Sequence, residues 1–161
     1  MIAVSKKIGE VTFRITPFDP FKQLQLFGNL QKEILPAVGG VLNVTLGSET
    51  VADADADAAA IKAFRELSAN FSGDVLLKWA NLLLEDDYIT FEFPGDEPKK
   101  LTKHNRTDAL PDMSYILELM FHVGKVNFAD PLQRWAGLSG LAQKLKVKLS
   151  GNSETISSKN S

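Results

Sequence analysis

Apolar and polar residues alternate in two short stretches of the chain, a pattern typical of half-buried β-strands. In "EVTFRIT", Val11, Phe13 and Ile15 share one face. "IAV" lies before this stretch, and Gly9 supplies the unusual backbone angles of a tight turn, so an N-terminal hairpin is predicted. The alternation returns in "YITFEF"; "PGDEP" then predicts a turn and "KKLT" a short returning strand.

Most of the remaining chain has apolar residues at helical spacing. Asp19 as a cap and Pro20 as the first helical residue predict the start of a helix that ends at Pro36. Gly28 falls on its apolar side, where the missing side chain would permit another element to approach closely. Further helices are predicted from near Asp57 to about Ala69, in "VLLKWANLLL" after a cap at Ser72 or Asp74, in residues 112–128 and in residues 131–148.

Two of these segments carry further expectations. "VLLKWANLLL" is apolar nearly all round, which predicts a place in the middle of the fold. "KHNRTDAL" is polar and predicts a loop. The order of the elements predicts an α+β fold, mainly α-helical, in which an N-terminal β-hairpin and a small antiparallel sheet pack with about five helices.

The length of 161 residues suits a single domain. We expect residues 1–149 to form it, with residues 131–149 either docked on it or acting as a mobile C-terminal helix. "SGNSETISSKNS" has no hydrophobic pattern, so residues 150–161 are predicted to be a disordered tail.

Composition excludes several classes of site. The chain has no cysteine, which removes disulfides, zinc–thiolate sites and thiol nucleophiles. A net charge of −2 argues against a protein that binds nucleic-acid phosphates. No signal peptide is visible, and the most apolar run is too short and too interrupted to cross a membrane.

Metal and catalytic motifs are also missing. "DADADAAA" starts like a calcium-binding EF-hand loop, but Ala58 and Phe64 stand where that loop needs glycine and glutamate, so we expect an acidic helix start. Two histidines, His104 in a polar loop and His122 on the polar side of its helix near Glu118, are predicted to be solvated. No nucleophile motif or phosphate-binding loop occurs, and Glu85–Asp87 reads as a solvated turn. We therefore expect no enzyme activity, no metal and no cofactor.

What remains is apolar helix surface. In "MSYILELMFHVGK", Met113, Ile116, Leu117 and Met120 form an apolar face that we assign to the core, and Asn127 is predicted to cap the helix in a left-handed conformation with Phe128 tucked beneath it. The last helix is also amphipathic. It either docks on its own domain or exchanges to a partner chain.

The layout resembles the tail assembly chaperones of long-tailed bacteriophages. The resemblance spans residues 8 to about 136 and rests on "VTFRITPFDPFKQLQL", the central apolar helices, the later strand and the helix that closes in "VNF" at residues 126–128. The "VADADADAAA" insertion and a longer C-terminal helix depart from the family pattern.

The resemblance implies a non-catalytic chaperone without cofactors in the host cytoplasm, absent from the mature virion. Its implied partners are the tape measure protein, which it keeps soluble, and the tail tube protein, whose subunits it helps to recruit; a homo-oligomer is compatible with this role, and neither nucleic acid nor membrane is expected. Our candidate partner-binding residues are Phe121, Val126, Trp135 and Leu138, because the last two helices could open a groove there.

Two other functions stay open at this point. One is a structural component of the virion, in the tail or at the head–tail joint. The other is an enzyme or a regulatory nucleic-acid binder, for which a salt-dependent interaction with DNA or RNA would be diagnostic.

Overall fold

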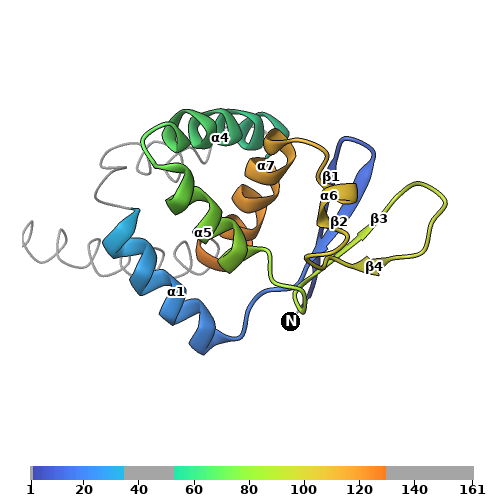
Figure 1. Cartoon of the computed structure of the whole chain (residues 1–161), viewed down its shortest axis with the longest axis horizontal. Helices are drawn as coiled ribbons and strands as arrows, with labels where there is room; N and C mark the ends of the chain where they lie inside the picture. Colours follow the sequence, from blue (N-terminus) through green and yellow to red (C-terminus); the bar gives the residue numbers. More distant parts are fainter. Residues whose placement is uncertain (1, 35–52, 130–161) are drawn as a thin grey trace, which may run out of the picture. The chain divides into compact units, whose positions relative to one another are not determined.

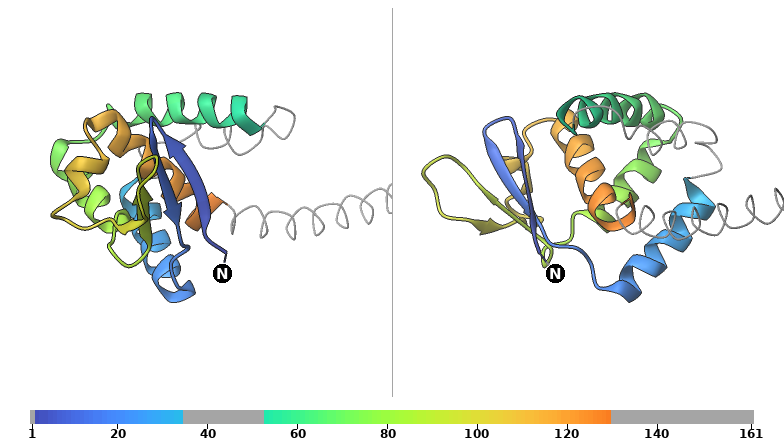
Figure 2. Two further views of the ribbon diagram at one scale, coloured as in Figure 1. Left: turned by 90° about the vertical axis from the view of Figure 1, so that its right-hand side faces the viewer. Right: turned by 180° about the vertical axis from the view of Figure 1, so that it is seen from behind.

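The computed structural model describes residues 2–34 and 53–129. In this part of the chain, helices α1, α4, α5 and α7 lie on one side of a four-stranded antiparallel sheet (Figures 1 and 2). The expected fold class, α+β and mainly helical with an N-terminal hairpin, is confirmed. The expected helix at residues 131–148 and the tail at 150–161 lie outside the described residues.

The sheet has the order β1-β2-β3-β4. Its strands are β1 (Val4–Ile8), β2 (Val11–Ile15), β3 (Ile89–Glu92) and β4 (Lys99–Lys100). Gly9 has a φ of +60° in the turn between β1 and β2, as the sequence predicted. The β2–β3 register pairs Phe13 with Phe91 and Ile15 with Ile89, and all four side chains are buried in the core. The alternating pattern therefore identified the inner face of the sheet.

Helix α1 (Pro20–Glu33) begins as predicted, because the Asp19 carboxylate accepts hydrogen bonds from the backbone N–H groups of Phe21 and Lys22, each at 3.1 Å. Its core-facing side chains include the buried Leu26. Gly28 is exposed, and within the described part of the chain no other element lies within 4 Å of the position a Cβ would take, so the close approach that this glycine permits is not used there. The predicted end at Pro36 lies outside the described residues.

A carboxylate joins α1 to α5 (Gly73–Leu83). The Lys78 ammonium donates to Glu33 Oε1 at 2.6 Å, and the Trp79 indole N–H donates to Glu33 Oε2 at 3.0 Å. The hydrogen bonds from Lys78 and Trp79, with the positive charge of Lys78, hold the pKa of Glu33 below its ordinary value. Glu33 is thus ionised at neutral pH and connects the two helices.

Three helix predictions need correction. Helix α4 (Asp53–Ser68) was expected to begin near Asp57 but begins four residues earlier. Helix α5 is capped by Ser72, one of the two predicted caps. Only one of its sides is buried, however, and Leu77 on another side is 57% exposed. The short helix α6 (Arg106–Ala109) forms in the stretch predicted to be a loop.

Helix α7 (Met113–Gly124) packs against β1, α4 and α5. The predicted solvation of His122 is wrong, because its side chain is only 4% exposed. With neighbours on several sides, α7 buries more than its apolar stripe, and the ring of His122 contacts that of Phe121. Glu118, the expected partner of His122, lies 3.8 Å from the Arg65 guanidinium on α4.

After Gly124 the helix widens into one π-helical turn, η1 (Lys125–Ala129), which points Asn127 into the core. Asn127 Oδ1 accepts from the backbone N–H of Phe18 at 2.7 Å and from Gln23 Nε2 at 3.2 Å, and its Nδ2 donates to the Val123 carbonyl at 3.0 Å. No described residue other than glycine has a positive φ, so the left-handed cap predicted at Asn127 is wrong. The burial of Phe128 is confirmed.

Candidate partner-binding pocket

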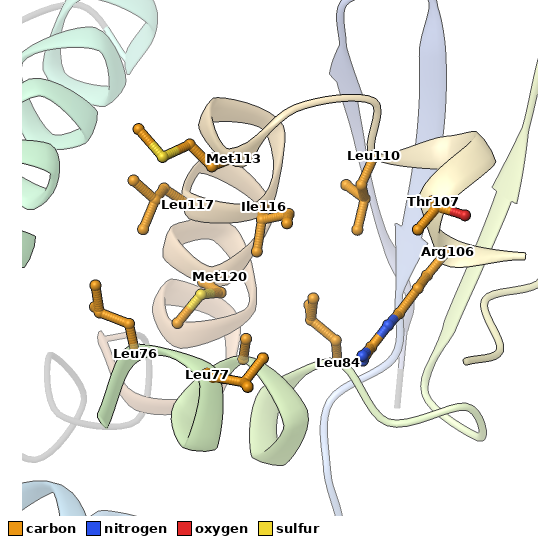
Figure 3. Close-up of a pocket in the computed structure, with 11 residues that line it drawn as sticks. Leu76, Leu77, Leu84, Arg106, Thr107, Leu110, Met113, Ile116, Leu117 and Met120 are labelled. Carbon is orange, nitrogen blue, oxygen red and sulfur yellow. The ribbon is translucent and has the colours of Figure 1, made fainter. Parts of the chain in front are cut away.

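An open pocket of about 340 Å³ lies between α5, α6 and α7 (Figure 3). Side chains from the three helices converge on it, and nearly all of them are leucine, isoleucine, methionine or alanine. Apolar surface that converges on a hollow, as opposed to single exposed apolar residues, is typical of binding sites.

Helix α7 forms one wall. Met113, Ile116, Leu117 and Met120 recur at helical spacing and so lie on one face of α7. Burial increases along this face, from Met113 at 77% exposed to Met120 at 4%. The prediction that this whole face belongs to the core is therefore wrong for its first turn, which is open to solvent at the pocket.

Helix α5 forms the opposite wall. Ser72 Oγ accepts from the backbone N–H of Val75 at 3.3 Å and fixes the start of the helix. From there, the helical repeat turns Trp79 into the core and leaves Leu76 and Leu77 facing the pocket. The apolar residues of α5 thus pack into the core on one side of the helix and line the pocket on another.

Helix α6 closes one edge of the pocket with Arg106, Thr107 and the following Leu110. The Asn105 side chain holds this helix in place by accepting from the Thr102 backbone N–H at 2.7 Å and donating to the Lys100 carbonyl at 2.9 Å. Arg106 is the one charged residue among those that line the pocket. Its Nη1 donates to Asn81 Oδ1 on α5 at 2.8 Å, which holds the guanidinium across the edge.

The start of α7 is fixed by Asp112. Its carboxylate accepts hydrogen bonds from the Ser114 hydroxyl and from the backbone N–H groups of Ser114 and Tyr115. The Ser114 hydrogen bonds are the largest reason why the pKa of Asp112 lies below its ordinary value; the Tyr115 N–H and the charge of Arg65 add to the effect. The cap stays ionised at neutral pH and places Met113 directly at the pocket rim.

Of the four candidate partner-binding residues from the sequence, the structure describes two, Phe121 and Val126. Phe121 is half-buried, and its ring packs at 6.1 Å from that of Phe64 on α4. Val126 is 8% exposed. Neither lines the pocket, while Trp135 and Leu138 lie outside the described residues. Their role in partner binding stays a prediction.

The described part of the chain offers neither a metal site nor a membrane-spanning helix. No group of three or more histidine, aspartate or glutamate side chains there could hold a metal ion. None of the described helices has the length and hydropathy needed to cross a membrane.

Comparison with known proteins identifies the family of this chain. A family model described as phage tail assembly chaperone protein, TAC, matches residues 9–141. Searches of the curated proteins and of the solved structures found no match. Because the matched region covers most of the 161 residues and nearly coincides with the region of resemblance in the sequence, the chain belongs to the phage tail assembly chaperone family.

Proposed function

We propose that this chaperone binds the tape measure protein of its phage, keeps it soluble in the host cytoplasm and helps to recruit tail tube subunits around it, without catalysis and without entering the virion. The observation that carries the proposal is the open apolar pocket between α5 and α7 on a chain of this family. A groove of this kind accepts the apolar face of a partner helix.

The free energy expected for binding in the pocket suits transient binding of an apolar segment of a partner. Each leucine-sized side chain that moves from water into such a pocket contributes about 1.5–3 kcal/mol. A few such contacts, less the cost of ordering the partner, give binding strong enough to prevent aggregation and weak enough to be released as the tail grows.

The test is co-expression of the tape measure protein with the full-length chaperone, followed by measurement of its soluble fraction. Leu77 and Met113 are 57% and 77% exposed, so the double variant Leu77→Gln/Met113→Gln should fold normally while presenting a polar pocket. We expect the soluble fraction of the tape measure protein to fall towards its level without chaperone.

Leu24→Gln is the matched control, since Leu24 is 67% exposed on α1 and does not line the pocket. It should preserve the solubilising effect. If the pocket double variant solubilised the tape measure protein as well as the unaltered chain, the pocket would not be the binding site; if the unaltered chain had no effect, the proposed function would be wrong.

The virion provides an independent check. Mass spectrometry of purified particles should find the tape measure and tail tube proteins without this chain. Recovery in many copies per particle would favour a structural component of the tail.

A further inference from the structure

Arg106 places one positive charge at one edge of an otherwise uncharged pocket. Every other side chain lining it is uncharged, and Arg106 lies at the α6 edge, opposite the Met113 end (Figure 3). The residue is half-buried, and α6 fixes its backbone, because the Arg106 N–H donates to the Thr102 carbonyl at 2.9 Å. A cation therefore sits at a defined place beside an apolar surface.

The guanidinium of Arg106 has capacity for a further acceptor. Arginine carries five N–H donors, and within the described part of the chain the acceptor it meets is Asn81 Oδ1. No carboxylate of the described residues forms an ion pair with it, whereas Arg14 and Arg65 each have one. The fixed fork of an arginine matches a carboxylate, with which it makes two parallel hydrogen bonds.

We infer that the pocket selects amphipathic helices that bear a carboxylate at the edge of their apolar stripe, where Arg106 receives it. The leucine and methionine walls take the apolar side chains, and an aspartate or glutamate about one helical turn away from them pairs with Arg106. The inference deepens the proposed function: the pocket discriminates among apolar helical segments of the tape measure protein and fixes the direction in which a segment binds.

Peptides covering the tape measure protein in overlapping steps test this with the full-length chain. Peptides that bind should share an apolar stripe at helical spacing with an acidic residue beside it. In fluorescence anisotropy, changing that acidic residue to glutamine or lysine should weaken binding about 10-fold or more, as expected for loss of a hydrogen-bonded charge pair at an interface. The affinity of the unaltered pair should also fall as salt is added.

A charge exchange in the protein tests the same contact from the other side. Arg106→Glu should weaken binding of acidic peptides and restore binding of their lysine versions. Arg106→Gln removes the charge, but its shorter side chain does not reach Asn81 as the guanidinium does. An unchanged urea midpoint of this variant therefore has to accompany the loss of affinity, to show that α6 is not displaced. Lys99→Glu makes the same change of charge on β4, at an exposed residue outside the pocket, and should leave every affinity unchanged.

The outcomes separate the two proposals. If Arg106→Glu binds acidic and lysine peptides as the unaltered chain does, the selection by charge is wrong while the proposed function stands. If the unaltered chain binds no tape measure peptide and leaves the tape measure protein insoluble, the proposed function is wrong. Sedimentation of the chain alone provides the third outcome: self-association lost in Arg106→Glu would assign the pocket to a second copy and overturn the inference.

Discussion

Asn127 should be the polar residue on which the fold depends most. Its side chain is 1% exposed and joins η1 to the segment that leads from the sheet into α1, through hydrogen bonds with Phe18 and Gln23. Leucine has a similar volume, so Asn127→Leu removes these bonds without leaving a large cavity. The substitution also removes the hydrogen bond from Asn127 Nδ2 to the Val123 carbonyl and buries an apolar side chain in place of a polar one, so the measured loss is the net of these changes.

The magnitude follows from what each former partner can do next. Phe18 is fully buried, so its backbone N–H cannot reach water, and an unsatisfied buried donor costs about 1–3 kcal/mol. Gln23 is half-buried and can turn to solvent, so losing its bond costs at most about 0.5–1.5 kcal/mol. We expect Asn127→Leu to lower the free energy of unfolding by about 2–4 kcal/mol.

Urea unfolding followed by circular dichroism would measure this loss. With a slope of about 2 kcal/mol per molar urea, the midpoint should fall by about 1–2 M. Asn29→Ala on the exposed side of α1 is the control and should change the free energy of unfolding by less than about 0.7 kcal/mol. A loss below about 0.5 kcal/mol for Asn127→Leu would refute the reasoning that these bonds hold α1 to η1.

Two further substitutions test contacts described above. Glu33→Gln should destabilise the protein at neutral pH and much less in acid. Because the folded-state pKa of Glu33 is lowered, its contribution to stability is present above the ordinary value of 4.5 and is lost as the pH falls through the folded-state value, so the urea midpoints of the two proteins should converge in acid. Equal midpoints at neutral pH would show that the contact with Lys78 contributes nothing. Gly9→Ala should lower the thermal midpoint more than Gly95→Ala. Both glycines have positive φ, but a Cβ at Gly9 would lie within 2.9 Å of Tyr115 ring atoms, whereas a Cβ at Gly95 would meet no described atom within 4 Å; equal losses would show that only the backbone conformation matters.

Local patterns predicted the elements whose signals are local. The alternation around Phe13 and Phe91, the turn at Gly9 and the caps at Asp19 and Ser72 each depend on a few neighbouring residues, and each was found as predicted. The start of α4 was misplaced because its first turn has no apolar stripe to mark it and alternates alanine with aspartate, a poor helix former in helix interiors that is favourable near a helix N-terminus. Element type was therefore easier to predict than element bounds.

The pocket was harder to predict, because burial depends on which elements cover a helix. The exposure of His122 and Met113 was predicted wrongly. Periodicity divides α7 into a polar and an apolar face, but the polar face is covered from the side of α4 and the hairpin, while α5, opposite the apolar face, leaves its first turn open at the pocket. No sequence motif predicts the π-helical turn that buries Asn127. The clue available in the sequence was α5, whose apolar circumference exceeds what one core contact can cover.

The strand order also governs when the molecule can fold during synthesis. The hairpin is translated before β3, yet its inner strand β2 pairs with β3. Thr12 can pair only once Glu92 has been made, and the Phe18 N–H can donate to Asn127 only once Asn127 has been made. A nascent chain that ends before Ile89 lacks both β3 and Asn127, the residue that holds the start of α1. Such distant pairings slow folding, and the pocket between α5, α6 and α7 can form only after nearly all of the described chain has been translated.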